Sequence, residues 1–444
     1  MLENFFEIRF SFIVIGGILA IIYLIYSIKK PEIIIYTAII FSGLSGSLSL
    51  INFGNLPFSG SGIFTITLLV NSAIVIISRI KYKPWIDSIK AYWHFSPFLF
   101  ILFFRAITSV YIFEGIQLFF LFLTPILIGI VARRELMRGW DVRRRVETSL
   151  LLIPLLPILV IMMNFLSGNL QITTLGFRTV IGLGLGPRPL ALFLLPILAL
   201  LVGKWKYSPK LGERILLFLG SMAITVVIIT SLSRVASVIA LLVIIPSRFL
   251  KKWYHPATLL TVVFGIGILL YWFSLPSVQE RFFPGGVESF KFDLSSFQSI
   301  DTQGRRNLWA LTWNESFDNP IIGKGTGSSS QLILSTFPPL EHPHNDYLRV
   351  FHDLGIVGLF AFIFAWAYQI LHNLKYWIIF DKQHNISAYY HLAAMIATIA
   401  ICISFLTDNT ITYVFVLIPL NIIYGLADAL LTDDKTHYQM QYSV

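Results

Sequence analysis

The chain has 444 residues, of which 56% are hydrophobic and only 13% are charged, and its formal net charge is +10 at pH 7. A soluble domain carries about a quarter charged residues, so this composition excludes a water-soluble globule. The positive charge does not indicate nucleic-acid binding, because the basic residues lie in short loops between apolar blocks. The lone Cys402 lies within such a block, which excludes an intramolecular disulfide.

The apolar residues form blocks of roughly 17–23 residues, the length that crosses a hydrocarbon core of about 30 Å as a helix. The blocks are continuous rather than alternating, which favours helices over barrel strands. The first block ends at Lys29, Lys30 and Pro31 rather than at a cleavage site, so it predicts a retained helix. The predicted spans are residues 10–28, 32–50, 63–79, 92–112, 115–132, 149–167, 189–203, 215–232, 235–247, 257–274, 354–374, 388–407 and 411–431.

This pattern predicts an all-α polytopic membrane protein with about 12–13 transmembrane helices. Four regions follow from it: a bundle of about ten spans, one long external loop, about three C-terminal spans and a short tail. Their predicted bounds are 1–274, 275–353, 354–431 and 432–444.

Most of the 33 lysines and arginines fall in alternate loops, which predicts that these loops are cytoplasmic. The loop from Arg133 to Arg145 is the richest, and we interpret it as a topology signal that contacts anionic lipids. The C-terminus is then inside, the N-terminus outside, and the long loop on the outer face.

The outer segment from Pro276 to Asp353 is rich in aromatic residues, which argues against disorder. Within it, Leu308, Trp309, Leu311 and Trp313 have helical spacing, and Asn319-Pro320 ends the run. We expect a helix over Arg305–Phe317 that lies on the membrane surface with its aromatic side chains down.

The strongest chemical signal is His342-Pro343-His344-Asn345-Asp346-Tyr347-Leu348-Arg349, followed by Gly355-Ile356-Val357-Gly358. An unperturbed histidine pKa near 6.5 suits a general base at neutral pH, so His344 is the candidate catalytic residue. Asn345 or Asp346 would cap the next helix and fix the imidazole, while Gly355 and Gly358 would allow close packing. The alternative is an interfacial histidine that only hydrogen-bonds a neighbour.

Arginines on the predicted outer side form the second signal. Arg178 lies in an outer loop, and Arg234 lies between two apolar runs with almost no loop. Arginine at such a depth is costly unless it is paired or solvated, which marks a candidate functional site. Arg305 and Arg306 are further candidates, and the alternative is ion pairing with Asp408, Asp301 or Glu315.

The roles of three other arginines, Arg188, Arg349 and Arg105, stay undecided. We expect the Arg349 side chain to face water, and Arg105 could pair with Glu114. Asp408 could pair with one of the candidate arginines or shape a sugar groove.

Two further patterns give weaker evidence for a functional site. Gly323-Lys324-Gly325-Thr326-Gly327-Ser328 lacks the spacing and the terminal Lys-Ser/Thr of a P-loop, so it predicts a tight turn that donates backbone N–H groups. His342, His344 and His352 have no accompanying carboxylate pair at helical spacing, so we expect no metal site.

His344-Asn345 followed by Gly355-x-x-Gly358, with Gly304 to Trp309 and Asp318 to Gly325 upstream, resembles the O-antigen ligase and Wzy-type polymerase superfamily. The resemblance implies a GT-C-like fold and a transferase that needs no cofactor. It implies that Arg178, Arg234, Arg305 and Arg306 bind the pyrophosphate of an undecaprenyl-linked glycan donor.

The resemblance leaves the acceptor open. A polymerase, which we favour, extends a second lipid-linked glycan and works with a chain-length regulator, whereas a ligase transfers the glycan to lipid A core. Either enzyme would invert the anomeric centre at the periplasmic face of a bacterial inner membrane, among membrane lipids. A transporter of lipid-linked sugars is the alternative of a different class, and it would more often show a helix repeat.

Overall fold

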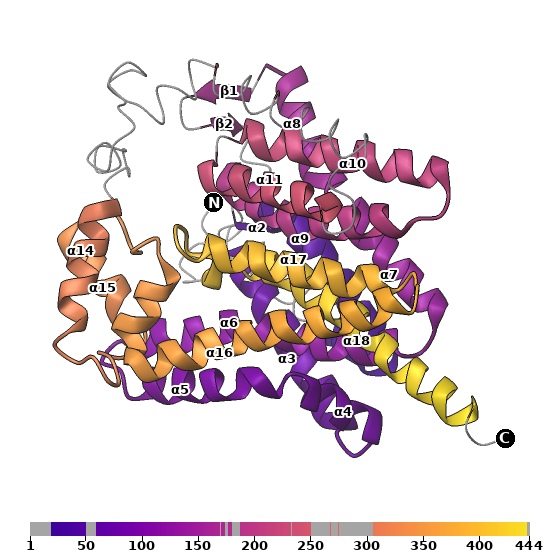
Figure 1. Ribbon diagram of the computed structural model, residues 1–444. Helices are drawn as coiled ribbons and strands as arrows, with labels where there is room; N and C mark the ends of the chain where they lie inside the picture. The colour runs from indigo at the N-terminus through magenta and orange to yellow at the C-terminus, as the bar shows by residue number, and fades with distance from the viewer. Residues whose placement is uncertain are drawn as a thin grey trace, which may run out of the picture.

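The computed structural model describes residues 19–49, 59–168, 170–173, 176–179, 187–231, 233–249 and 305–441, and the single positions 267 and 274. Within these ranges it is a bundle of helices with one small β-hairpin (Figure 1). Apart from positions 267 and 274, the predicted span 257–274 lies outside the described residues, as does the first part of the predicted outer loop.

Helical residues 19–29 precede the first labelled element. The labelled elements in chain order are α2 (Glu32–Ser49), α3 (Gly60–Arg79), α4 (Lys83–Ala91), η1 (Trp93–Phe95), α5 (Ser96–Ile107), α6 (Ile112–Leu136), α7 (Trp140–Leu152), α8 (Leu155–Leu166), β1 (Leu170–Thr173), β2 (Gly176–Thr179), α9 (Pro187–Tyr207), α10 (Leu211–Thr230), α11 (Arg234–Phe249), α14 (Arg305–Ser316), α15 (Ser328–Thr336), α16 (Asp346–Lys382), α17 (Ala388–Ser404), η4 (Thr410–Thr412) and α18 (Val414–Gln441).

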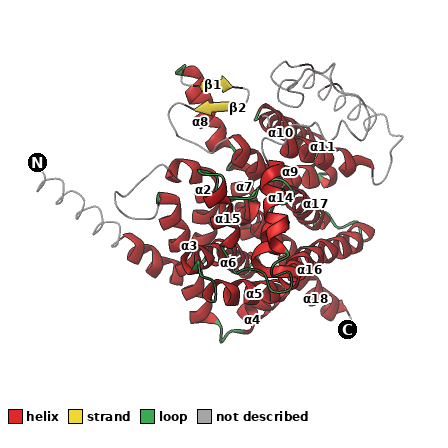
Figure 2. Cartoon of the chain, turned by 90° about the vertical axis from the view of Figure 1, so that its left-hand side faces the viewer, coloured by secondary structure: helices red, strands yellow, loops and turns green. Residues whose placement is uncertain are grey.

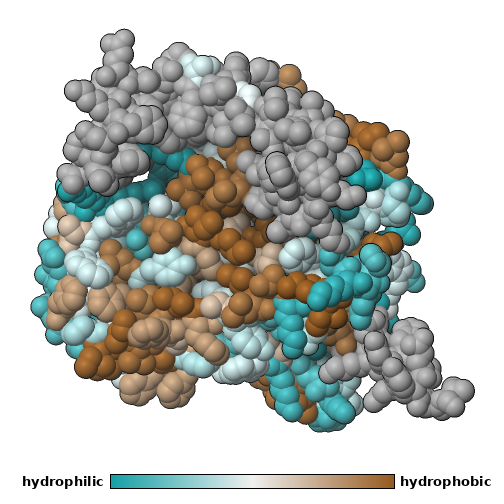
Figure 3. Space-filling view, in the orientation of Figure 1, coloured by the Kyte–Doolittle hydropathy of each residue, from teal (hydrophilic) through white to brown (hydrophobic). Residues whose placement is uncertain are grey.

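Among the described residues, seven helices are long and apolar enough to cross a membrane, and five apolar helices of 10–17 residues accompany them. The predicted all-α polytopic fold is thus confirmed. In α9 and α18 the most apolar stretches are 83% and 89% buried, so these helices form the centre of the bundle. Peripheral helices leave Phe100, Leu216 and Phe360 largely exposed, and Figure 3 shows a hydrophobic band across the middle of one face. Apolar surface of this extent is suited to lipid.

Two local features differ from the sequence-based expectation, and a third agrees with it. Strands β1 and β2 form an antiparallel hairpin, in which Gln171 pairs with Arg178, whereas an all-helical chain was expected. Helix α16 begins at Asp346, so the last residues of the predicted loop 275–353 already belong to this helix. The predicted helix over Arg305–Phe317 is confirmed as α14, which ends at Ser316.

One end of the bundle carries the basic loops, on the right in Figure 1, near α4 and the C-terminus. Here Arg133 lies 3.7 Å from Asp428, and Lys204 lies 3.2 Å from Glu147. Arg133 is only 8% exposed and Arg143 only 6%. The expectation that this loop contacts lipid headgroups is therefore wrong for these two arginines, which pack between helices instead.

The opposite end carries α14 and α15, which lie on the left in Figure 1 and in front of the bundle in Figure 2. The chain segment around His344 leads from α15 into α16 at this end. The candidate site and the basic loops that the structure describes are therefore separated by the length of the helices.

Candidate functional site

A kink in α16 holds the segment before α15 against the start of this helix. Gly355 has φ +67° and ψ −169° inside this helix, a conformation that is essentially confined to glycine. The freed N–H groups of Ile356 and Val357 donate to the carbonyls of Pro320 and Ile321, at 2.8 and 3.3 Å. Gly355 therefore does more than permit the close packing that was expected, because it breaks the helix and docks residues 320–322 against it.

The glycine-rich turn before α15 is fastened to the same helix. The N–H groups of Gly327 and Ser329 donate to the buried Asp353 carboxylate at 2.9 and 2.8 Å, and the Ser328 hydroxyl donates to it at 3.0 Å. The turn was expected to offer N–H groups near the site, but these two bind Asp353. Lys324 pairs with Glu315 and Asp318 at 2.6 and 2.7 Å. Glu315 therefore pairs with Lys324, whereas the alternative raised from the sequence was a pair with a candidate arginine.

His344 is held by the loop between α17 and α18. Its φ is +54°, and its backbone N–H donates to Asn409 Oδ1 at 3.1 Å. Asn409 Nδ2 then faces His344 Nδ1 at 3.1 Å, and Asp408 Oδ1 lies 3.8 Å from the same nitrogen. Since the amide orientation is fixed by the backbone N–H, Nδ1 accepts, and the neutral imidazole carries its proton on Nε2.

Asp408 connects this histidine to arginines from other parts of the chain. Burial would raise the pKa of the Asp408 carboxyl, but the nearby His344 ring and the hydrogen bond that the Asn409 backbone N–H donates at 2.9 Å hold this pKa below its usual value. The positive charge of Arg305 lowers this pKa further. The Tyr413 hydroxyl also donates to Asp408, at 3.1 Å. The carboxylate is therefore ionised at neutral pH.

Three guanidinium groups share this environment. Burial lowers the pKa of Arg305, the first residue of α14, and the positive charges of Arg188 and Arg234 add to that effect. Arg188 lies in the first turn of α9, and Arg234 is the first residue of α11. Cations crowded in this way favour an anion between them. Arg234 therefore lies at the same end of the bundle as His344.

The remaining candidate arginines lie in other surroundings. Arg178 lies on β2, which contacts α9, and its side chain is outside what the structure describes. Arg306 is exposed on α14 and lines a groove rather than pointing to Asp408. Arg105 Nη2 donates to the Gly323 carbonyl at 2.7 Å, so the expected pair with Glu114 is wrong.

The residues after His344 have separate tasks. Asn345 is the N-cap of α16, since its Oδ1 accepts the Leu348 N–H at 3.0 Å, as expected for one of the two candidates. Asp346 is fully buried and accepts the Ile411 N–H at 2.9 Å, which ties α16 to η4. Gly358 packs so tightly against Leu354 that an added Cβ would lie 2.1 Å from that side chain.

His342 and Arg349 line a second cavity near the site. Arg349 is 4% exposed and donates to the Ser330 hydroxyl at 2.9 Å, so the expectation that it faces water is wrong. Ser330 also lies 3.4 Å from His342 Nδ1. These contacts close a polar cavity beside the first turn of α16.

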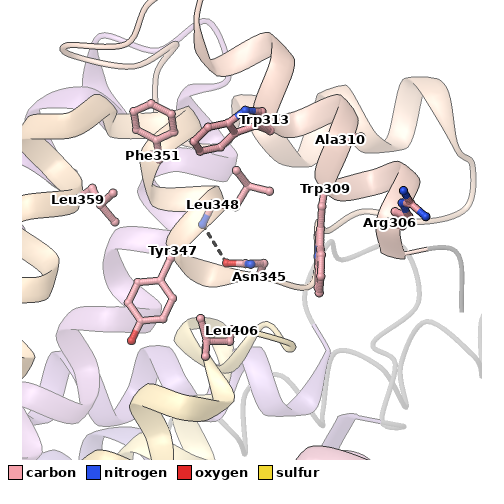
Figure 4. Close-up of a pocket in the computed structure, with 10 residues that line it drawn as sticks. All are labelled: Arg306, Trp309, Ala310, Trp313, Asn345, Tyr347, Leu348, Phe351, Leu359 and Leu406. Atoms are coloured by element: carbon pink, nitrogen blue, oxygen red, sulfur yellow. Dashed lines mark hydrogen bonds between the residues drawn. The ribbon is translucent and has the colours of Figure 1, made fainter. Parts of the chain in front are cut away.

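An apolar groove of about 490 Å³ runs between α14 and the start of α16. Figure 4 shows Trp309, Trp313 and Phe351 around it, with Arg306 at the end near the start of α14. The indole Nε1 of Trp309 donates to the Pro343 carbonyl at 2.8 Å, which attaches α14 to the segment that carries His344. The groove therefore begins beside the candidate catalytic residue.

Sequence reasoning missed Asn409, because a single polar residue after a span carries no signal of its own. It left Arg188 and Asp408 open, and only the folded chain brings them together with Arg305. Among the described residues, no group of three or more His, Cys, Asp or Glu side chains could hold a metal ion.

These features define a multi-pass helical membrane protein with a polar, arginine-rich site at one end of the bundle. Residues 215–363 match the family model Wzy_C, described as O-antigen ligase. The match confirms the resemblance predicted from the His344 motif: this segment of the chain is similar to the O-antigen ligase and Wzy superfamily. It includes Arg234, Arg305 and His344 but ends before Asp408. A search of curated proteins found no match.

Proposed function

We propose that the protein transfers a glycan from a polyprenyl-pyrophosphate donor to an acceptor hydroxyl at the end of the bundle that carries His344. The observation that carries this proposal is the clustering of Arg188 and Arg234 with Arg305, which itself acts on the Asp408 carboxylate beside His344. The O-antigen ligase family match supports the same reaction class.

The arginine cluster would bind the pyrophosphate. Guanidinium groups recognise phosphate oxygens bidentately, and three of them grouped near a single carboxylate leave a net positive site. Charge collects on the pyrophosphate as its bond to the sugar C1 breaks, so fixed cations stabilise the transition state more than the ground state. Arg178, which lies on a strand against α9, is proposed to reach the same phosphates. No metal ion is needed for this leaving group.

His344 would act on the acceptor hydroxyl. In the resting tautomer Nε2 carries the proton and can donate a hydrogen bond. To accept the proton of the attacking hydroxyl at Nε2, the ring must first release its Nε2 proton to solvent and take up a proton from solvent at Nδ1. The Asn409 Nδ2 group, now 3.1 Å from Nδ1, must then turn away, and the Nδ1–H faces the Asp408 carboxylate 3.8 Å away. Asp408 would stabilise the imidazolium that results. Direct attack inverts the anomeric centre.

The apolar groove would guide the polyprenyl tail. It is lined by Trp309, Trp313 and Phe351 and begins beside the segment of His344. Arg306 at its end would contact the phosphates or a lipid headgroup. A tail in this groove places the pyrophosphate at headgroup depth, within reach of the arginine cluster.

The identity of the acceptor distinguishes two versions of this proposal. A polymerase of surface polysaccharide would extend a second lipid-linked repeat unit, and this is the reading we favour. A ligase would use lipid A core, and the similarity to a family described as O-antigen ligase favours this second acceptor. Supplying each acceptor separately to the purified protein, with one labelled donor, decides between them by which acceptor gains mass.

The reaction class is tested with protein in lipid nanodiscs and the undecaprenyl-pyrophosphate-linked repeat unit. We expect His344→Ala and Arg234→Ala to lower the transfer rate by about 10²-fold or more. Glu315→Gln is the control, because Glu315 contacts Lys324 outside the cluster. A transporter would keep its flux in His344→Ala, so unchanged glycan movement without any transfer would refute the transferase.

A further inference from the structure

A second cavity, of about 390 Å³, lies between α6, α15 and the start of α16. Its volume falls in the range of roughly 300–1,000 Å³ that is usual for small-ligand sites. In contrast to the apolar groove, its wall combines polar side chains with Leu118, Leu121 and Leu334. The polar residues that line it include Glu114, Gln117, Ser330, Gln331, His342 and Arg349.

Arg349 is the most informative of these residues, because it is 4% exposed and yet incompletely paired. Its Nη2 donates to the Ser330 hydroxyl at 2.9 Å. Among the described residues, its Nε and Nη1 have no hydrogen-bond partner. Buried donors in native proteins are almost always paired with protein, water or ligand, so these two N–H groups indicate a polar occupant of the cavity.

The charges of the cavity argue against a phosphate ligand. Glu114, whose carboxylate accepts from Gln331 at 2.9 Å, and Glu341 supply two negative charges, against one positive charge on Arg349. Burial lowers the pKa of His342 to about 3, and the charge of Arg349 contributes, so this imidazole is neutral at pH 7. A pyrophosphate would be repelled here, whereas it suits the arginine cluster.

The donors and acceptors instead match hydroxyl groups. Carboxylates only accept and a guanidinium only donates, whereas the amide side chains of Gln117 and Gln331 do both. A hydroxyl both donates and accepts, so neighbouring hydroxyls of one ring can satisfy Glu114 and Arg349 together. An uncharged, polyhydroxylated ring fits this wall better than an apolar or an anionic ligand.

The cavity adjoins His344. Thr412 lines it and donates to the Asn409 carbonyl at 2.7 Å, and Asn409 holds the imidazole of His344. The apolar groove is lined by Tyr347 and Leu348, so the first turn of α16 separates the groove from the polar cavity. A ligand in the groove and a second ligand in the polar cavity would therefore meet near His344.

We propose that this polar cavity binds a sugar ring of the acceptor glycan, with Glu114 and Arg349 contacting its hydroxyls. The assignment of the ring to the acceptor rests on the proposed function, because the donor is assigned to the arginine cluster and the apolar groove. The cavity would then orient the attacking hydroxyl toward His344.

The probes are two water-soluble oligosaccharides, the free repeat unit released from the lipid-linked donor by mild acid and the delipidated core oligosaccharide. Neither has a lipid tail or a pyrophosphate, so neither depends on the groove or the cluster. Saturation-transfer NMR with protein in nanodiscs measures their affinity. We expect one of them to bind, and Glu114→Gln and Arg349→Lys each to weaken that binding about tenfold.

Glu114→Gln keeps an oxygen that accepts from Gln331, so the fold is preserved, and Glu315→Gln is the matched control for loss of a carboxylate. Arg234→Ala should leave oligosaccharide binding unchanged. Equal affinity in the wild type and both cavity variants, or binding of neither probe, overturns the proposal even if transfer is active. Variant-sensitive binding without transfer activity supports the cavity as a sugar site and refutes the proposed function.

Discussion

Replacement of Gly355 by alanine tests how the site is held together. An alanine Cβ would lie 2.3 Å from the carbonyl of Ile321, and the backbone conformation costs about 1–3 kcal/mol for any residue other than glycine. Moving residues 320–322 away breaks two hydrogen bonds, from Ile356 and Val357, worth about 0.5–1.5 kcal/mol each. Docking of this segment should therefore weaken by about 2–6 kcal/mol.

Hydrogen exchange with mass spectrometry measures this loss locally. A cost of about 2 kcal/mol or more predicts that protection of the Ile356 and Val357 amides falls about 30-fold or more. Gly212→Ala is the control, since an added Cβ there has no described neighbour within 4 Å, and we expect no measurable change. Wild-type protection in Gly355→Ala would refute the argument that this kink docks the turn.

Three further changes test single contacts. Asp408→Asn should lower kcat about 10²-fold without raising the KM for the donor, because the imidazolium of His344 loses its counter-ion; an unchanged kcat contradicts this. Asn345→Ala removes the N-cap bond to Leu348 and should cost about 1 kcal/mol in thermal unfolding, with Asn345→Ser close to wild type. The pKa of His342 is lower in the folded protein than in the unfolded chain, so stability should fall by up to about 2 kcal/mol between pH 6.5 and 5, and His342→Gln should remove this slope.

The sequence by itself determined the class of fold. Continuous apolar blocks leave no alternative to membrane-spanning helices, because lipid offers no hydrogen-bond partners to an open backbone. It also determined helix α14, which follows from the spacing of Leu308 and Trp309, and it narrowed the N-cap of α16 to Asn345 or Asp346, of which the structure selects Asn345. These are consequences of neighbours in the chain, so local chemistry suffices to predict them.

Only the tertiary structure decided how the site is assembled. Arg188 and Arg305 lie at the starts of two separate helices and Asp408 in the loop after α17, and no spacing in the sequence links them. Arg349 follows the histidine motif and looked exposed, yet packing against Ser330 buries it in the wall of a cavity. The physical reason is that burial and charge coupling depend on which segments the bundle brings into contact, and pairwise distances between remote residues are not encoded in local periodicity.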